Sequence, residues 1–376
     1  DGRGGRGSSL LINNLTVRCP LNGLSFGNVS YNILRELYKL DTRISLLPVG
    51  NKADLSAFDS IDQGFAEWIK TSLEDRYKTI KREDPFINLW HVTGSDSKIG
   101  DKNVLYSFYE GSQPTEEEVN LVKLYDSVVF SSKYARDSFR SAGADNACAV
   151  PLGFDEDFRI LDKEYLKGKV HFGLMGKWEK RKHTSKIIQT WAKTYGNNYD
   201  FQLSCCVNND FLSQKQIAAS KSEALMGESY GNINFLPRLP KNSQVNDFLN
   251  SIDIDLGGMS GAEGWNLPSF NATCLGKWSI VLNATSHKDW AKEDNCILVE
   301  PSGEESLHDG IFFIKGSEFN QGVRYAFAEE DLIKAMDTGV KLASEKKINS
   351  KGIELREKFS YKNTVKGILD KIIEIS

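Results

Sequence analysis

Short apolar runs alternate with amphipathic stretches along almost the whole chain. Apolar runs of about four to eight residues bounded by turn residues predict strands, and apolar residues recurring every three or four positions predict helices. Alternation of the two is typical of the β-α-β units that build parallel sheets. It occurs in two series, one from Leu10 to about Val150 and one from Val170 to about Val299. The sequence therefore predicts an α/β protein with two doubly wound, Rossmann-like domains.

Each series predicts the strands of one sheet. The first has apolar runs at 10–13, 44–49, 87–90, 104–108, 127–131 and 147–150. The second has them at 170–175, 201–207, 233–236, 252–256, 278–282 and 297–299. Helices are predicted between the strands, for example over 183–195 and 244–250, and an irregular insertion follows to about Phe327. Because ligands of open α/β sheets bind at the carboxyl ends of the strands, we expect two domains facing each other across a cleft.

Turn residues and composition divide the chain further. The polar, turn-rich segment 151–169 is predicted to link the two series. We expect an N-terminal domain over 10–160, a C-terminal domain over 161–355 and a helix over 356–376. Residues 1–9 contain G-x-G-x-x-G but no preceding strand, so we interpret them as a tag or flexible leader.

Composition excludes several classes of function. The 376 residues carry 47 Lys and Arg against 51 Asp and Glu, a net charge of −4, so no global positive field recruits nucleic acid. The 6 cysteines form no C-x-x-C pair, which argues against a zinc knuckle or a redox dithiol. No run reaches the roughly 18 apolar residues that a membrane span requires. We therefore expect a soluble, cytoplasmic protein without a membrane span.

A basic loop follows the first strand of the second series. Four cations, Lys177, Lys180, Arg181 and Lys182, stand between a predicted strand and a predicted helix, directly after Gly176. A helix N-terminus already favours an anion, and a glycine lets the backbone approach it closely. The loop is predicted to bind a diphosphate; the alternative is a solvated charged loop.

An acidic turn follows in the same series. Gly261, Gly264 and Pro268 interrupt regular structure just before a predicted helix, which places Glu263 on a turn. A carboxylate at such a turn can accept hydrogen bonds from hydroxyl groups of a ligand. Capping of the helix alone is the competing interpretation.

The first series contributes weaker candidates. His91 and Glu110 each follow a predicted strand and so are expected at the cleft, although a buried structural histidine and a local ion pair remain alternatives. Gly23 lies in a loop before a predicted helix. Asp253 and Asp255 form a D-x-D match, but they alternate with apolar residues and are interpreted as strand structure, not as a metal site.

Three segments together resemble a known family. EGWNLP at 263–268, GKWEKRK at 176–182 and PLGFDEDF at 151–158 resemble landmarks of retaining GT-B glycosyltransferases of the large glycogen-synthase-like family 4, in the same order and spacing. The sequence of residues 263–290 is also similar to that of glycosyltransferases encoded by tailed bacteriophages. The resemblance implies a GT-B fold and transfer of a sugar from a nucleotide-diphosphate sugar. It also implies that the domain over 10–160 is the acceptor domain, that the domain over 161–355 is the nucleotide-sugar domain, and that the helix over 356–376 crosses back to the first domain.

The resemblance also implies roles for individual residues. Glu263 is implied to contact donor sugar hydroxyls, Lys177 and Lys182 to hold the diphosphate with Arg181 beside them, and His91 to lie near the donor sugar. The remaining donor-site positions implied are Gly23, Gly264, Trp265, Asn266, Leu267 and Asn271. The family carries a second Glu where this chain has Asn271, and usually a Gly where it has Asn266.

These implications give one favoured function and a rival. The favoured function is a retaining transferase that uses a UDP-sugar, with Glu263, His91 and Lys182 as catalytic residues, no tightly bound cofactor and no required metal. Its hydroxyl acceptor is either a glycan or a hydroxymethylated base in phage DNA, the latter contacted by a basic stripe from Lys70 to Arg82. The rival, prompted by Asn271, is a catalytically weak nucleotide-sugar-binding or scaffold protein.

Overall fold

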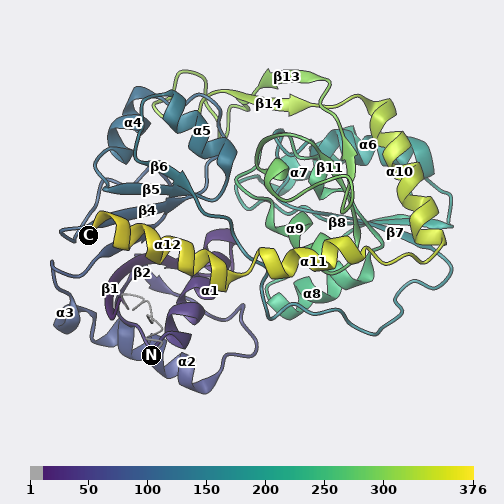
Figure 1. Ribbon diagram of the computed structural model, residues 1–376. Coiled ribbons are helices and arrows are strands. Elements are labelled where there is room, and N and C mark those ends of the chain that lie inside the picture. Colours follow the sequence, from purple (N-terminus) through teal and green to yellow (C-terminus); the bar gives the residue numbers. More distant parts are fainter. Residues whose placement is uncertain (1–11) are drawn as a thin grey trace, which may run out of the picture.

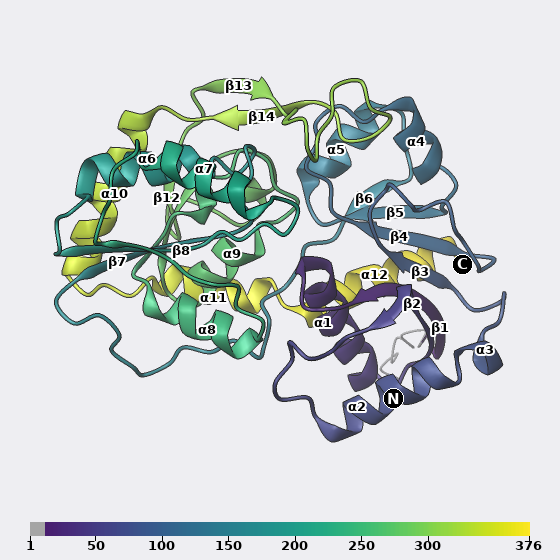
Figure 2. The same ribbon diagram turned by 180° about the vertical axis from the view of Figure 1, so that it is seen from behind.

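The framework of the protein consists of two parallel six-stranded sheets with helices packed against them (Figures 1 and 2). The structure, a computed structural model, describes residues 12–376. The predicted α/β architecture of two doubly wound sheets facing each other is confirmed. The predicted leader over 1–9 lies outside the described residues.

The first sheet has the strand order β2-β1-β3-β4-β5-β6, and all neighbours run parallel. Its strands are β1 (Asn14–Leu21), β2 (Arg43–Ala53), β3 (Phe86–Leu89), β4 (Asn103–Ser107), β5 (Ser127–Phe130) and β6 (Ala147–Ala149). The order reverses between β1 and β3, so the loops that follow these two strands leave in opposite directions and open a crevice at the edge of the sheet.

The position of the first strand corrects the sequence prediction. A strand was expected over 10–13, but β1 spans Asn14–Leu21, with Leu15, Val17, Cys19 and Leu21 all buried. The alternation of these residues is a weaker signal than a continuous apolar run, and β1 is buried because it is a central strand. The pairing register with β2 shifts between Cys19 and Leu21, around Pro20, which has no N–H to donate.

The second sheet has the order β12-β11-β10-β7-β8-β9. Its strands are β7 (Val170–Met175), β8 (Phe201–Cys206), β9 (Ile233–Phe235), β10 (Ile254–Asp255), β11 (Trp278–Leu282) and β12 (Ile297–Val299). The predicted positions agree except that β10 begins later, because the preceding helix continues to Ser251. Numbered along the chain with β7 as the first strand, and starting from β9, the strands lie side by side in the order 3-2-1-4-5-6. The order reverses between β7 and β10, so the crevice lies between these two strands.

Helices connect the strands of both sheets. Those of the first sheet are α1 (Ser25–Lys39), α2 (Gln63–Glu74), α3 (Arg76–Thr79), α4 (Glu116–Val122) and α5 (Lys133–Ser141). Those of the second are α6 (Thr184–Tyr195), α7 (Gln214–Ala224), α8 (Asn242–Ser251), α9 (Leu267–Cys274) and α10 (Glu329–Ser344), with short 3-10 turns η1 (Gly257–Met259) and η2 (Thr285–Asp289). None of the helices formed by residues 12–376 is both long and apolar enough to cross a membrane.

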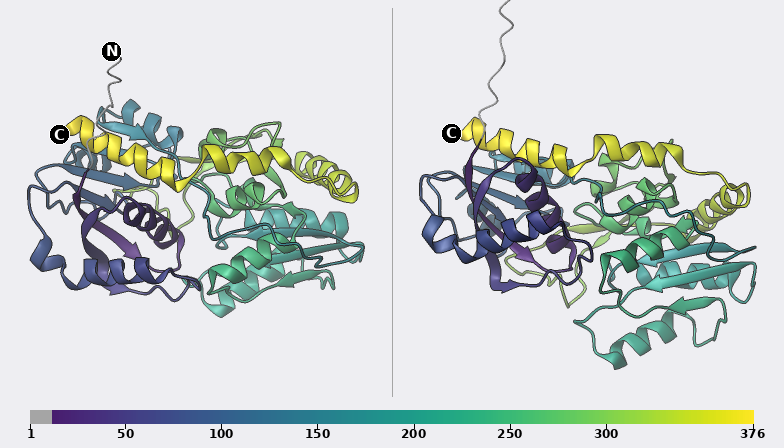
Figure 3. Two further views of the ribbon diagram at one scale, coloured as in Figure 1. Left: turned by 60° about the horizontal axis from the view of Figure 1, so that its bottom comes forward. Right: turned by 90° about the horizontal axis from the view of Figure 1, so that it is seen from below.

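The last two helices run from the second sheet to the first. α11 (Ser350–Lys358) packs on α9, whereas α12 (Tyr361–Ile375) packs on α1 (Figure 3). Val365, Ile368 and Ile372 form the buried face of α12, and Thr364 Oγ1 donates a hydrogen bond to the Pro151 carbonyl at 2.8 Å. The division into domains at 160 and 355 stays a prediction.

The segment after β12 is more regular than its sequence suggests. Within it, β13 (Gly303–Ser306) and β14 (Val323–Ala326) pair antiparallel. The long loop between them reaches across to the first half of the molecule, where the Gln321 carbonyl accepts hydrogen bonds from the Ser112 and Gln113 amides. Figure 2 shows this hairpin spanning the top of the two sheets. β13 (GEES) is exposed and has no apolar residue, so the sequence gives no strand pattern that predicts this hairpin.

Candidate functional site

A pocket of about 480 Å³ lies between the carboxyl edges of the two sheets, at both points where the strand order reverses. Its lining includes every residue that the family resemblance implies for the site: Gly23, His91, Lys177, Arg181, Lys182, Glu263, Gly264, Trp265, Asn266, Leu267 and Asn271. The volume lies within the range of small-ligand sites. The structure thus brings together candidates from four separate regions of the chain, while their individual roles stay predictions.

A buried carboxylate that is paired with two cations lines the pocket. Glu263 is 6% exposed, and its Oε1 lies 2.6 Å from Lys182 Nζ. Its Oε2 lies 3.2 Å from a terminal nitrogen of Arg181, whose Nε lies 2.9 Å from Glu179. The basic loop after β7 and the acidic turn before α9 are therefore joined through side chains.

These charges determine the ionisation of Glu263. Burial by itself raises the pKa of the carboxyl group, but the charges of Lys182 and Arg181 outweigh burial and lower the pKa from 4.5 to about 2. The carboxylate is consequently ionised at neutral pH, and it can accept hydrogen bonds but cannot donate a proton.

The conformation of the basic loop separates its four cations. Gly176 has a φ of +146°, a region that side chains rarely adopt, and a Cβ there would meet the Lys182 side chain at 3.4 Å. Lys177 is exposed at the pocket and lies over the ring of Phe211 at 5.3 Å. Lys180 is exposed and does not line the pocket. The interpretation as a solvated loop therefore fits Lys180 alone.

Asn266 shapes the start of α9. It has a left-handed φ of 72°, which Asn tolerates better than most residues, and it stands where the family motif has Gly. Its Nδ2 donates to the Gly257 carbonyl at 3.1 Å and lies 3.0 Å from His287 Nε2. Its side chain is thus engaged by the protein, so Asn266 braces the turn that carries Glu263.

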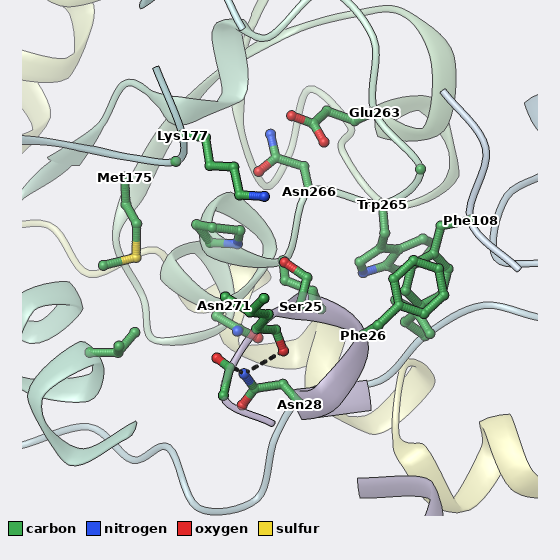
Figure 4. A pocket seen from close by; sticks show the side chains of 18 of the residues that line it. Ser25, Phe26, Asn28, Phe108, Met175, Lys177, Glu263, Trp265, Asn266 and Asn271 are labelled. Atoms are coloured by element: carbon green, nitrogen blue, oxygen red, sulfur yellow. Dashed lines mark hydrogen bonds between the residues drawn. The ribbon is translucent and has the colours of Figure 1, made fainter. Parts of the chain in front are cut away.

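Two buried polar atoms in the wall have no partner among residues 12–376. Asn271 Oδ1 and Trp265 Nε1 lack hydrogen bonds, although their residues are only 7% and 3% exposed. Buried polar groups are nearly always paired in proteins. Both atoms therefore keep an unused hydrogen-bonding capacity in residues that line the pocket. Figure 4 shows both residues at the pocket, with Lys177 and Glu263 on one side of it and Ser25 and Phe26 on the other.

The first sheet contributes the opposite side of the pocket. His91, directly after β3, is exposed to the pocket, and Glu110 lies after β4. Desolvation by the surrounding protein lowers the pKa of His91, the charge of Glu110 raises it and that of Lys177 lowers it again, and the net shift is downward. His91 is therefore neutral at pH 7. Gly23 lies in the loop between β1 and α1.

Sequence reasoning missed the aromatic part of this side. Phe26, at the start of α1, contacts both Phe108 and His91, with ring centroids 4.1 Å and 4.5 Å away. Trp90 lies 5.7 Å from the same ring. We call Phe26, Trp90, His91 and Phe108 the aromatic wall. Of these four residues, the sequence predicted only His91 for the site. The rings come from three distant segments, and no local sequence pattern links them.

Other polar residues near the site lie behind the pocket lining or are structural. The ring of His287 is buried and bridges the Leu282 carbonyl and Asn266. Asp253 accepts from the His171 amide at 2.8 Å and Asp255 from the Gly257 amide at 3.0 Å, which agrees with their interpretation as strand structure. Residues 12–376 contain no group of three or more His, Cys, Asp or Glu arranged to hold a metal.

Gly264 sets how closely the acidic turn approaches the first sheet. Its carbonyl accepts a hydrogen bond from Ser131 Oγ at 2.7 Å, and a Cβ at this position would lie 2.9 Å from Phe108 Cβ. We expect Gly264→Ala to destabilise the fold by about 1–3 kcal/mol, because neither backbone can yield freely. Urea unfolding measures the loss.

A matched control separates this contact from the general effect of removing a glycine. Gly303, in β13, has nothing within 4 Å of the position of an added Cβ. Gly303→Ala is therefore expected to change stability by less than about 0.5 kcal/mol. Equal effects of the two variants would show that the contact with Phe108 does not constrain the turn.

Comparisons with solved structures identify the architecture. HepE of Anabaena, in complex with UDP and glucose, matches with a TM-score of 0.67 and 12% identity, over 96% of this chain and 99% of that chain. The fold is GT-B. Sucrose-phosphate synthase from Thermosynechococcus elongatus matches with a TM-score of 0.66 and 10% identity, over 96% and 99% of the two chains.

A third GT-B match carries a sugar nucleotide. The structure described as trehalose-6-phosphate from E. coli bound with UDP-2-fluoro glucose has a TM-score of 0.64 and 9% identity, over 96% of this chain and 98% of that chain. No family model and no curated protein matches the sequence. Identities this low show a shared fold. The expected phage origin gains no support from these three neighbours.

Proposed function

We propose that this protein transfers a sugar from a nucleoside-diphosphate sugar to a hydroxyl group of an acceptor. The bond between the anomeric carbon and the β-phosphate oxygen breaks, and a bond from that carbon to the acceptor oxygen forms. The proton of the acceptor hydroxyl passes to the departing diphosphate, so the products are the glycosylated acceptor and the nucleoside diphosphate. A UDP-sugar is the favoured donor.

The observation that carries this proposal is the Glu263 cluster in the pocket of a GT-B fold. An ionised, buried carboxylate beside two cations suits a ligand that presents hydroxyl groups next to a diphosphate. Glu263 would accept hydrogen bonds from the donor sugar. Lys182 and Arg181 would face the diphosphate, whose charge grows as the bond to the sugar breaks, and they would stabilise that charge electrostatically. His91 would lie near the donor sugar.

The nucleotide end of the donor is assigned to the turn around α9. Asn271 would bind a ribose hydroxyl with its unpartnered Oδ1, in place of the acid found in the related family. HepE has also been solved with UDP-glucose, and its likeness to this fold supports a UDP-sugar as donor. Retention at the anomeric carbon rests on the family resemblance, which implies attack on an oxocarbenium-like species from the face of departure.

The acceptor is proposed to enter from the side of the first sheet. DNA is the less favoured acceptor, because the basic stripe from Lys70 to Arg82 lies on α2, α3 and the following loop and contributes no residue to the pocket lining. Two of its cations, Lys70 and Lys78, already lie within 4.0 Å of Glu74 and Asp75.

We expect the transferase to work in the cytoplasm.

The first test uses calorimetry to compare UDP binding by the wild type with binding by a variant of Lys177, the exposed cation at the pocket. Lys177→Met is expected to weaken UDP binding about tenfold, because one charge-assisted contact to phosphate is worth about 1.5–3 kcal/mol. Lys180→Met is the matched control, since Lys180 is exposed in the same loop but outside the pocket. Uridine, which lacks the diphosphate, should bind both variants equally.

The outcomes distinguish the proposal from its rivals. Absence of UDP binding, or equal losses in the two lysine variants, would contradict the assignment of the diphosphate site. Binding of UDP-glucose with no release of UDP, with or without acceptors, would favour the nucleotide-sugar-binding or scaffold protein.

A further inference from the structure

The two sides of the pocket differ sharply in charge. The cations in its lining are Lys177, Arg181, Lys182 and Arg238, and all four belong to the half of the molecule that carries the second sheet. Among the residues described, the first-sheet half contributes no Lys or Arg to the lining, only the carboxylates of Glu110 and of the buried Asp155. Phosphate groups therefore find cationic side chains on the second side and none on the first.

The first side instead offers rings. In the aromatic wall, Phe26 packs against Phe108 and His91, and Trp90 contacts both Phe26 and His91, with its ring centroid 4.9 Å from that of His91. Phe26, Trp90 and Phe108 are only half-buried, and His91 is exposed, although the wall lies inside the pocket. Half-buried rings that face a ligand site present flat apolar surface without any charge.

Trp265 completes this surface from the acidic turn. Its ring is fixed by edge contacts with Phe270 and Phe359, and its carbonyl accepts a hydrogen bond from Trp290 Nε1 at 3.0 Å. Its own Nε1 has no partner in residues 12–376, although only 3% of the residue is exposed. In Figure 4 the indole lies beside Phe108, with its nitrogen on the edge turned away from that ring. A fixed, unpaired N–H donor in a pocket wall points to a ligand oxygen.

We propose that the aromatic wall binds an uncharged sugar ring of the acceptor, with the Trp265 indole N–H donating to one of its hydroxyl oxygens. The inference rests on the proposed transferase function. A sugar ring has an apolar C–H face, which packs on Phe26 and its neighbours, and a hydroxyl edge, which takes hydrogen bonds. A DNA base also stacks on aromatic rings, but its flanking phosphates would meet Glu110 and find no cation on this side.

The test compares acceptors of different charge on the full chain. UDP-glucose is the donor, and the acceptors are neutral mono- and disaccharides, the same sugars as phosphate esters, and duplex DNA with hydroxymethylated cytosine. Transfer is read by mass spectrometry, and binding in the presence of UDP by saturation-transfer NMR. We expect the neutral sugars to bind and to accept glucose at least tenfold more efficiently than the phosphates or the DNA. Preference for a charged acceptor, or no binding of any neutral sugar, would overturn the inference.

Variants locate the binding surface. Phe26→Leu and Trp265→Phe are each expected to raise the KM or Kd of the neutral sugar about tenfold, with little change in the Kd of UDP. Phe26→Trp should restore binding, because it keeps a flat ring. Tyr77→Leu is the aromatic control, since Tyr77 is 72% exposed on α3. Melting curves establish whether each variant folds. Of the two, Trp265→Phe is expected to disturb the packing less, because it retains an aromatic ring.

Three results would separate failure of this inference from failure of the proposed function. Unchanged sugar binding in both variants, with UDP bound normally, would refute the aromatic wall as the acceptor surface and leave the transferase intact. A higher Kd for UDP in Trp265→Phe would indicate that the indole N–H contacts the donor, and would overturn its assignment to the acceptor. A wild-type chain that does not bind UDP would overturn the transferase and the inference together.

Discussion

Replacing Glu263 by glutamine is expected to lower the rate of sugar transfer at least a hundredfold. The substitution keeps the size of the side chain but removes the charge that Lys182 and Arg181 face at 2.6 and 3.2 Å. Loss of one preorganised electrostatic contact at a reacting centre costs roughly a hundredfold to a thousandfold in turnover. Release of UDP from UDP-glucose in the presence of a sugar acceptor measures it.

Two further variants separate catalysis from folding. Glu263→Gln leaves the partly buried Lys182 without its counter-charge and leaves the buried Arg181 with Glu179 alone, so it should also destabilise the fold. Glu263→Asp keeps the charge but shortens the side chain, and it should recover much of the stability while turnover stays low. Glu304→Gln, on the exposed strand β13, is the matched control and should alter neither. Full turnover in Glu263→Gln would refute the central role of this carboxylate.

The same cluster predicts a pH dependence of stability. The pKa of Glu263 is lowered from 4.5 to about 2 in the folded protein, a difference on the order of 3 kcal/mol. A lowered folded-state pKa means that the stabilisation is complete above pH 4.5 and is lost as the pH falls toward 2. The difference in stability between the wild type and Glu263→Gln should therefore shrink over that interval and stay constant above it.

The second large effect is expected at Arg35, where Arg35→Met should destabilise the fold by about 3–5 kcal/mol. Arg35, on α1, is paired with Asp155 at 3.3 Å, Glu156 at 3.0 Å and Asp157 at 2.8 Å, all in the segment after β6. Asp155 is 5% exposed, so removing the guanidinium leaves a buried carboxylate without a cation. The midpoint of thermal unfolding should fall by several degrees.

A double-mutant cycle tests whether the pairing itself is responsible. Arg35→Met combined with Asp155→Asn should recover part of the loss, because the second change removes the unpaired charge. Arg43→Met, at an exposed position at the start of β2, controls for removal of an arginine and should change stability little. Strictly additive losses in the cycle would contradict a direct coupling of Arg35 to Asp155.

The sequence by itself determined the elements and the chemistry that is local to each loop. All six strands of the second sheet appear at or near their predicted positions, since a buried parallel strand is a continuous apolar run. The basic loop and the acidic turn could be recognised because glycines and charges stand next to strand ends within a few residues. The first strand was misplaced because a buried strand with alternating polar residues gives a weaker signal than the apolar run before it.

Only the tertiary structure decided which of these loops meet. The pairing of Glu263 with Lys182 joins residues 81 positions apart, and that of Arg35 with Asp155 joins residues 120 apart. The aromatic wall assembles rings from three segments, and burial rather than sequence leaves Trp265 Nε1 and Asn271 Oδ1 without partners among the described residues. Periodicity and turn chemistry act over a few residues. Charge, stacking and desolvation depend on distances that exist only once the two sheets are packed together.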